Sequence, residues 1–366
     1  MLASLLAALT GAARSTHPWH PAPPASPALA QGLRRRQFAL LPLALAASAC
    51  TPQIIPAGMP VTAPTVSPRA FIMADGARLP YRAWLPQGQP RAVLLGLHGF
   101  GDYSVNAFDI PAPLFTAAGI AVYAYDQRGF GAAPHRGIWP GAPTLVSDAI
   151  AVTRLVRARH PGIPLYLMGE SMGVAVLLVA ATSANPPPAD GYVLLAPAVR
   201  GRASMAPWMR MVLEFASRAI PLVGFRASAP GFAPTDSEEA MERWARDPLT
   251  AKEVRVDAVY GLVDLMDEAV AAVPRFRART LILYGGHDAL VPEEAMQKML
   301  QTLPAGAPHR FAFYPKGYHL LLRDRNRAVV TRDIAAWVLD PDGPLPSGAD
   351  EAGRRWLAGF NAQATG

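Results

Sequence analysis

The sequence predicts an α/β protein in which a mostly parallel central sheet has helices on both faces and carries a helical lid insertion. Short apolar runs bounded by turn residues recur along the chain, as strands buried on both faces of a sheet do. Helical patterns lie between these runs, and strands that alternate with helices form parallel sheets. One long interval, residues 198–278, contains no clear strand and indicates an insertion.

The first predicted element is a hairpin, and the buried strands follow it. Residues 71–84 form two short runs on either side of Asp75-Gly76, a dipeptide that favours tight hairpin turns. The expected buried strands are residues 92–97, 121–125, 165–168, 192–195, 280–284 and 310–314. Helical patterning is clearest at 145–158 and 172–183. We therefore expect a parallel sheet with the hairpin at one edge.

The interval 198–278 is rich in large apolar residues. They are Met205, Trp208, Met209, Met211, Val212, Phe215, Ile220, Leu222 and Phe225. Two interpretations fit them, namely packing within a helical core and an apolar lid over a binding site. We place a lid at about 198–278, within a folded domain over 70–340 that a C-terminal tail over 341–366 follows.

The net charge of +7 is concentrated near the N-terminus. The chain of 366 residues has 34 Lys and Arg against 27 Asp and Glu. Arg14, Arg34, Arg35 and Arg36 lie within residues 1–49, which contain no acidic residue. The rest of the chain is close to neutral and has no basic run with interleaved aromatic residues. This distribution argues against a nucleic-acid partner.

Residues 1–49 contain the parts of a bacterial export signal. Three arginines at 34–36 precede an apolar segment over 38–49 and a small-residue cleavage site. As a helix this segment would be about 18 Å long, too short for a hydrocarbon core of about 30 Å. Arg35-Arg36-Gln37-Phe38 resembles the twin-arginine export motif. Residues 1–33 do not fit a signal, which a true start near Leu33 would explain.

Cys50 is the only cysteine, which excludes an intramolecular disulfide and any zinc site with two thiolates from one chain. The sequence Ala47-Ser48-Ala49-Cys50 resembles a lipobox, in which the cysteine becomes the lipidated first residue of the mature chain. Ala47 departs from the leucine that is usual there. The alternative is ordinary cleavage after Ala49 that leaves a free thiol. We expect lipidation of Cys50.

A proline-rich segment follows this cysteine. Its prolines are Pro52, Pro56, Pro60, Pro64 and Pro68. Such a segment favours extended backbone and cannot form a helix. We expect a tether over 50–69 that reaches at most roughly 56 Å. The protein is then an exported, membrane-anchored lipoprotein of the cell envelope that faces the periplasm or the cell surface, with a soluble periplasmic protein as the alternative.

The sequence Gly169-Glu170-Ser171-Met172-Gly173 lies between a predicted strand and a predicted helix. A nucleophilic serine on a sharp strand-to-helix turn needs minimal side chains two positions before and after it, and Gly169 and Gly173 meet this need. The motif alone is a weak signal, but its position after a strand and before a helix makes it strong. We predict Ser171 as the nucleophile.

A serine needs a base and an acid that orients the base. Asp288 follows the predicted strand 280–284, and His319 follows the predicted strand 310–314. Both lie beyond the carboxyl ends of strands, where open α/β sheets bind ligands. We predict Ser171, Asp288 and His319 as a catalytic triad.

A fourth motif, His98-Gly99-Phe100-Gly101, follows the predicted strand 92–97. Gly99 lets the backbone turn, so that the Phe100 N–H can point at the site. The Met172 N–H supplies a second donor, and the two form the predicted oxyanion hole. No metal-ligand spacing and no dinucleotide-binding motif after a strand occurs, so we expect no metal and no cofactor.

Together these motifs resemble the α/β-hydrolase superfamily and, within it, the monoacylglycerol lipase and lysophospholipase-like group, also called the serine aminopeptidase group. The segments that carry the resemblance are residues 98–104, 126–131, 169–173, 247–249, 285–288 and 317–319. Val174 and Leu320 depart from the pattern of the group. The resemblance implies an esterase that cleaves monoacylglycerols or lysophospholipids through an acyl-enzyme.

The same motifs are also compatible with other functions. The same triad serves aminopeptidases, thioesterases and acyltransferases, and a surface lipoprotein can bind apolar ligands without catalysis. Asp264, Asp267 and Glu268 are rival acids, but they lack a preceding strand and fit the polar face of a lid helix.

Overall fold

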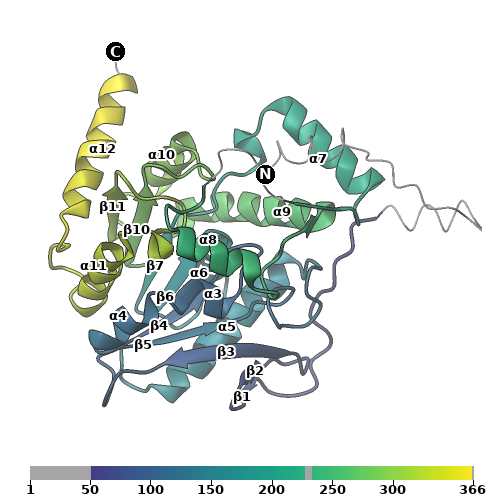
Figure 1. The fold of residues 1–366 in the computed structure, drawn as a ribbon, viewed down its shortest axis with the longest axis horizontal. Coiled ribbons are helices and arrows are strands. Elements are labelled where there is room, and N and C mark those ends of the chain that lie inside the picture. Colours follow the sequence, from purple (N-terminus) through teal and green to yellow (C-terminus); the bar gives the residue numbers. More distant parts are fainter. Residues whose placement is uncertain (1–50, 227–232, 365–366) are drawn as a thin grey trace, which may run out of the picture.

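A computed structural model describes residues 51–226 and 233–364 (Figure 1). The export signal and Cys50 therefore lie outside the described residues. The chain forms a nine-stranded sheet with the order β1-β2-β3-β5-β4-β6-β7-β10-β11. Six strands are parallel: β4 (Ala92–Leu97), β5 (Ile120–Tyr125), β6 (Leu165–Glu170), β7 (Gly191–Leu195), β10 (Thr280–Gly285) and β11 (His309–Tyr314). Every residue of β4, β5, β6, β7 and β10 is buried, which explains their apolar runs.

The predicted hairpin forms the antiparallel edge of the sheet. β2 (Ala70–Ile72) pairs with β3 (Arg78–Trp84), and β3 pairs with β5. Gly76 in the connecting turn has φ +80°, a conformation that favours glycine. β1 (Thr65–Val66) adds a short strand outside β2. The prediction of an edge hairpin is confirmed.

Helices cover both faces of the sheet. One apolar core lies beneath α5 (Ala142–Arg159), α6 (Met172–Ala181), α9 (Val256–Ala272) and α10 (Glu293–Thr302). The core on the opposite face lies beneath α3 (Ser104–Phe108), α4 (Ala112–Ala117) and α11 (Arg327–Leu339). This arrangement confirms the predicted fold class.

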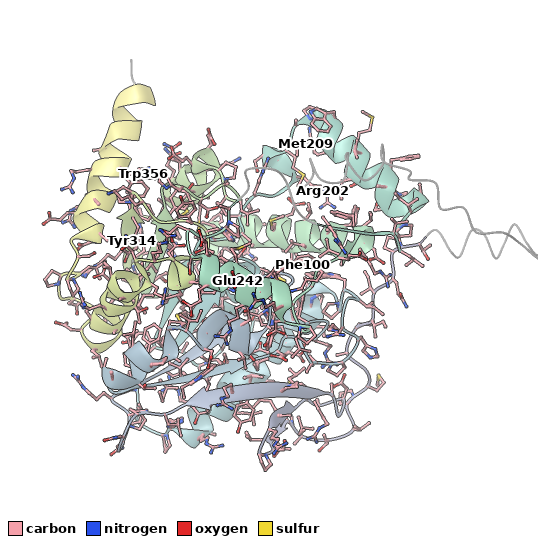
Figure 2. The ribbon with its side chains drawn as sticks, viewed as in Figure 1. Phe100, Arg202, Met209, Glu242, Tyr314 and Trp356 are labelled. Carbon is pink, nitrogen blue, oxygen red and sulfur yellow. The ribbon has the colours of Figure 1, made fainter. Side chains whose placement is uncertain are left out.

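The C-terminal region differs from the predicted tail. Residues Ala349–Ala364 form helix α12, which lies beside β11 at the edge of the sheet (Figure 1). Trp356 points from α12 toward the sheet (Figure 2) and contacts the rings of Tyr284, Phe311 and Phe313. Because these aromatic faces would otherwise be exposed at the edge, α12 completes the fold and is not a free extension.

The insertion between β7 and β10 contains a small substructure of its own. Its elements before α9 are η1 (Arg202–Ser204), α7 (Pro207–Ala219), β8 (Gly224–Phe225), α8 (Glu238–Arg246) and β9 (Val254–Arg255). Figure 1 shows α7 on the far side of α9 from the sheet. Arg202 forms ion pairs with Asp264 and Asp267 on α9, so these two acids hold the insertion together.

α9 has two roles, because it closes the insertion and also belongs to the layer on the sheet. Its residues Leu262, Leu265 and Ala269 are buried in the core shared with α6, whereas Val259 and Val263 pack against α7. η2 (Val273–Arg275) then leads into β10. The covering part of the predicted lid is therefore the segment before α9.

The proline-rich segment is extended, as expected, but it does not stand free of the body. The Gln53 N–H donates to Asp257 Oδ2 at 2.9 Å, the Ile55 N–H to the Trp139 carbonyl at 3.0 Å, and the Ala57 N–H to Thr144 Oγ1 at 3.1 Å. Residues between the prolines keep their N–H groups, so the segment can bind along the surface like an edge strand. Residues 53–57 are called the N-terminal strap below.

The described residues contain no helix that is long and apolar enough to span a bilayer. The same residues contain no cluster of His, Cys, Asp and Glu side chains arranged to hold a metal ion.

Candidate active site

The turn between β6 and α6 carries Ser171 in a conformation that few non-glycine residues adopt. Its backbone has φ 53° and ψ −111°, and its side chain is half-buried. A Cβ at Gly169 would lie 2.6 Å from the Val174 nitrogen, and one at Gly173 would overlap the Leu97 carbonyl. The two glycines therefore allow α6 to begin directly against β4 and β6, which lifts the serine out of the sheet.

Asp288 and His319 form a buried hydrogen-bonded pair at the same edge of the sheet. His319 Nδ1 lies 2.8 Å from Asp288 Oδ2. Asp288 Oδ1 accepts the Leu290 and Val291 N–H groups at 2.8 and 3.0 Å, so the carboxylate is fixed by three donors. This pairing assigns the Nδ1 proton to the bond with Asp288 and leaves Nε2 of His319 available as a base.

The charge of Asp288 determines the titration of His319. Burial alone would lower the pKa of His319, but the nearby Asp288 carboxylate and its hydrogen bond outweigh burial and raise this pKa above its ordinary value. Among the described residues no hydrogen bond joins the Ser171 hydroxyl to His319, a contact that catalytic sites often complete only with substrate bound.

A tight turn beside the serine presents the Phe100 amide. The Asp102 N–H donates to the Gly99 carbonyl at 3.3 Å, and Gly101 has φ +78°. Gly99 packs against Ser171, since a Cβ added there would lie 3.5 Å from the serine Cβ. Met172 is the first residue of α6, where an N–H has no acceptor within the helix. The geometry thus gathers Ser171 and both predicted oxyanion donors around one turn.

His98 anchors this turn and has no place in proton transfer. Its Nδ1 lies 2.8 Å from the Gly99 carbonyl, and its Nε2 accepts the Gln127 N–H at 3.0 Å. These bonds assign the proton to Nδ1. Complete burial lowers the pKa of His98, which keeps the ring neutral. The segment that contains Gln127 therefore has a structural role beside this turn.

The insertion contacts both loops that carry predicted site residues. The Ala251 N–H donates to the Gly101 carbonyl at 2.8 Å, and the Tyr103 hydroxyl donates to Asp247 Oδ2 at 2.5 Å. On the other side, the Leu320 N–H donates to the Pro234 carbonyl at 2.8 Å. A displacement of the insertion would therefore act on the Phe100 turn and on the His319 loop.

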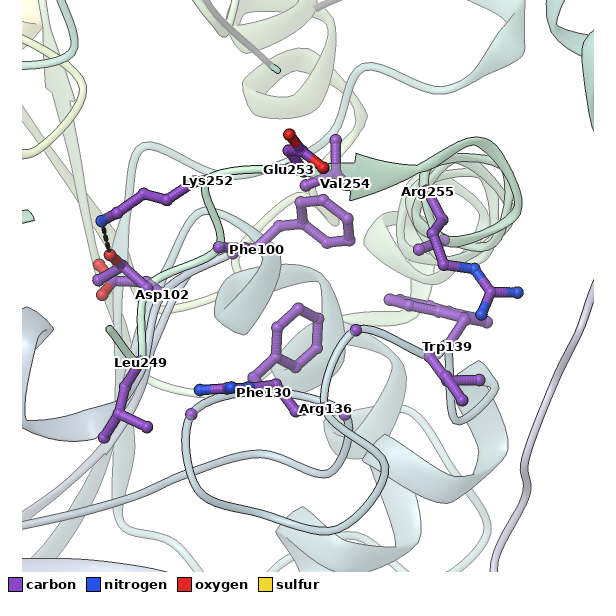
Figure 3. Close-up of a pocket in the computed structure, with 18 of the residues that line it drawn as sticks. Phe100, Asp102, Phe130, Arg136, Trp139, Leu249, Lys252, Glu253, Val254 and Arg255 are labelled. Atoms are coloured by element: carbon purple, nitrogen blue, oxygen red, sulfur yellow. Dashed lines mark hydrogen bonds between the residues drawn. The ribbon is translucent and has the colours of Figure 1, made fainter. Parts of the chain in front are cut away.

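A cavity of about 360 Å³ lies beside the Phe100 turn. Figure 3 shows the rings of Phe100, Phe130 and Trp139 around it, and the insertion closes it with residues 248–255. Phe100 thus lines the cavity with its ring while its amide belongs to the turn beside Ser171. Arg136, Lys252 and Arg255 add cationic groups to the lining, and Asp102 and Glu253 add acidic ones.

One buried cluster beside the site is not indicated by the sequence. Arg323 forms ion pairs with Asp102 and Glu170, and all three side chains are almost fully buried. Glu170 stands inside the serine motif and Arg323 lies shortly after His319, but no spacing in the sequence indicates that they meet. The only sequence signal for this cluster is Glu170 itself, an acidic residue within an otherwise small and apolar motif, which would need a buried partner.

The chain resembles known proteins in sequence and in fold. Residues 88–326 match the family described as serine aminopeptidase, S33. A monoacylglycerol lipase of Mycolicibacterium smegmatis is 26% identical over 285 residues, which are 75% of this chain and 98% of that protein. The human monoglyceride lipase is 25% identical over 278 residues, which are 73% of this chain and 89% of that protein.

Two solved structures share the fold. They are the monoacylglycerol lipase from Paleococcus ferrophilus, with a TM-score of 0.58, 20% identity and coverage of 71% of this chain and 98% of that chain, and a monoglyceride lipase variant from Saccharomyces cerevisiae in complex with a substrate analog, with a TM-score of 0.61, 20% identity and coverage of 77% and 97%. These matches agree with the predicted α/β-hydrolase fold.

The close packing around the Ser171 turn, called the elbow below, predicts opposite effects on stability for alanine substitutions at two helical glycines. Gly173→Ala places a methyl group against the Leu97 carbonyl, so we expect a loss of about 1–3 kcal/mol in the free energy of unfolding. Gly359→Ala in α12 meets open space and should raise it by about 0.5–1 kcal/mol. Urea denaturation of both variants measures the difference, and equal effects would contradict the close approach of α6 to β4.

Proposed function

Because the chain belongs to the serine aminopeptidase family of α/β-hydrolases, we propose that it is a carboxylic ester hydrolase that cleaves monoacylglycerol-like lipids through an acyl-enzyme on Ser171. The observation that carries this proposal is the buried pair of His319 and Asp288 at the edge where the strained Ser171 turn lies. Burying the Asp288 carboxylate among three hydrogen-bond donors costs free energy of folding. The pair that it forms with His319 is useful because it can remove the proton of the serine.

The proposed reaction has two halves. His319 Nε2 accepts the Ser171 proton as Oγ attacks the ester carbonyl, and the Phe100 and Met172 amides stabilise the oxyanion that forms. His319 then gives its proton to the departing alcohol. Water attacks the acyl-enzyme by the same route and releases the acid. Asp288 stabilises the imidazolium in both halves, in keeping with the raised pKa of His319.

The substrate class rests on the cavity and on the relatives. Aromatic rings line the cavity beside the Phe100 turn, which suits an apolar ligand. The names of the relatives state that they act on monoacylglycerols or monoglycerides. A panel of p-nitrophenyl esters, monoacylglycerols, lysophospholipids, thioesters and aminoacyl amides separates the proposed lipid esterase from a peptidase, thioesterase or acyltransferase on the same residues.

Ser171→Ala should reduce kcat on a medium-chain p-nitrophenyl ester by at least about 10³-fold, since the covalent route is lost. Labelling by a fluorophosphonate probe should disappear with it. Ser183→Ala, at the end of α6, removes a hydroxyl that only caps the Ala180 carbonyl and should keep full activity. If Ser171→Ala stays within about tenfold of wild type, the nucleophile is assigned wrongly.

The raised pKa of His319 predicts the pH profile. The base must be neutral, so kcat/KM should fall as pH decreases through a midpoint above the ordinary histidine value of about 6.5. Asp288→Asn removes the charge that raises this pKa, so its midpoint should shift to lower pH while kcat falls by about 10⁴-fold. Profiles of kcat/KM for both proteins test this, and an unshifted midpoint in the variant would show that Asp288 does not control His319.

For localisation, we propose export to the cell envelope and anchoring through lipidated Cys50. The N-terminal strap supports a short attachment, because only residues 51 and 52 separate Cys50 from the bonded Gln53. At about 3.5 Å per residue, the distance from Cys50 to Gln53 is at most about 10 Å, far less than a free tether would give. An acyl chain on Cys50 would hold the folded body close to the membrane.

The surface beside the strap suits a membrane. Its exposed apolar residues are Trp208, Met211 and Phe215 on α7 and Leu222 and Val223 shortly after it, and together we call them the apolar face of α7. Asp257 accepts the Gln53 N–H and donates its own N–H to the Pro221 carbonyl at 3.0 Å, so the strap and this face meet at the start of α9. Apolar side chains at this place can enter the interfacial region of a bilayer.

Two variants test this attachment in cells and with vesicles. The protein expressed with its own leader should sediment with membranes, and Cys50→Ser should release most of it. In the Cys50→Ser background, Trp208→Ser with Phe215→Ser should abolish the remaining binding to phospholipid vesicles. Leu114→Ser on α4, an exposed apolar residue outside this face, is the matched control. Unchanged membrane association of Cys50→Ser would contradict the anchor.

A further inference from the structure

A single buried guanidinium joins three segments that carry the proposed catalytic groups. Arg323 lies in η3 (Leu321–Arg323), shortly after His319, with a side chain that is 2% exposed. Its Nη1 donates to Asp102 Oδ2 at 2.6 Å, and its Nη2 donates to Glu170 Oε1. The two acids belong to the turn after β4 and to the end of β6.

Each partner of Arg323 fixes backbone next to a reacting group. Asp102 closes the turn that contains Phe100, and its Oδ1 also accepts the Tyr103 N–H at 2.8 Å and Asn106 Nδ2 at 2.7 Å. Glu170 directly precedes Ser171. The position of the Phe100 amide relative to Ser171 thus depends on one planar fork that bridges both carboxylates.

Burying the three charges of this cluster carries a large desolvation penalty, so the cluster is a poor source of stability for the fold. Nε of Arg323 and Oε2 of Glu170 have no hydrogen-bond partner among the described residues, although both are buried. Burial raises the pKa of Glu170 even though Arg323 opposes this shift. Well-packed apolar residues often replace such buried ion clusters with no loss of stability. Stability alone therefore gives little reason for three charges at this place.

We propose that Arg323 is a positioning residue, which through Asp102 and Glu170 holds the oxyanion-hole turn and the Ser171 elbow in register with the His319 loop. This inference rests on the proposed function and adds a residue to its machinery. Lysine cannot replace arginine here, because its ammonium is a point charge that cannot hold two carboxylates in one planar geometry.

The test compares Arg323→Lys with a matched variant elsewhere in the fold. Arg128 is also buried between two carboxylates, Asp75 and Asp148, but neither of these lies on a proposed catalytic loop. Both substitutions keep the positive charge but remove the planar guanidinium that bridges two carboxylates. We expect both to lower the melting temperature, and only Arg323→Lys to lower kcat, by about 10- to 100-fold with KM within about threefold.

A trifluoromethyl ketone with the acyl chain of the substrate supplies a second readout. Its adduct with Ser171 places an oxyanion between the Phe100 and Met172 amides, so its affinity should fall in Arg323→Lys by the same factor as kcat/KM. A role limited to folding would not change this affinity in protein that is fully folded at the assay temperature.

A charge-free variant keeps the proposal testable if Arg323→Lys folds poorly. In Arg323→Met with Asp102→Asn and Glu170→Gln, no buried charge is left unpaired, so the protein should fold, yet kcat should stay reduced. Wild-type kcat and ketone affinity in this variant, or in a folded Arg323→Lys, would overturn the positioning role. Failure of a fluorophosphonate to label wild-type Ser171 would instead overturn the proposed function itself.

Discussion

The site depends on the close approach of α6 to the strands β4 and β6. Helix α6 begins at Met172, directly after the strained Ser171, and nearly all of its residues are buried. Strain of this kind costs on the order of 1–3 kcal/mol and persists only where the surrounding packing enforces it. Here the apolar side chains of α6 pack under α5 and α9, so the helix cannot retreat to relax the serine. The hydrophobic core thus maintains the strained conformation of Ser171.

The loops around this fixed point are held by polar contacts. His98 ties the Phe100 turn to Gln127, Arg323 ties it to Glu170, and Asp288 is fixed by amides of its own loop. Such bonds are directional, so they define positions to a few tenths of an ångström, which apolar contacts do less well. The division is physically sensible, because burial supplies most of the stability and hydrogen bonds specify the geometry.

The sequence predicted those features that have a local cause. Buried strands appear as apolar runs, the hairpin appears as Asp75-Gly76, and the elbow appears as glycines that flank Ser171, because each is determined by neighbouring residues. Their order along the chain then placed Asp288 and His319 beyond strands at the same sheet edge.

Features that depend on distant contacts were not predictable in this way. A proline-rich segment has the same composition whether it hangs free or lies along a surface, so the bond from Gln53 to Asp257 left no local signal. The sequence does not predict that α12 packs on the sheet, because the aromatic rings that Trp356 contacts belong to β10 and β11. The Arg323 cluster joins three segments that are far apart in sequence, and only the fold brings them together.

The strap also connects attachment with the site. Its Ile55 N–H binds the carbonyl of Trp139, whose ring lines the cavity, and its Gln53 binds Arg255 at the rim of the same cavity. With an anchor at Cys50, the cavity and the apolar face of α7 would lie near the membrane together. A lipid could then pass from the bilayer into the cavity with little exposure of its acyl chain to water. Exposure of the chain would cost roughly 0.8 kcal/mol for each methylene that enters the aqueous phase, and this route avoids that cost. If Cys50 carries the proposed anchor, the short strap would serve a lipid substrate better than a long flexible stalk would.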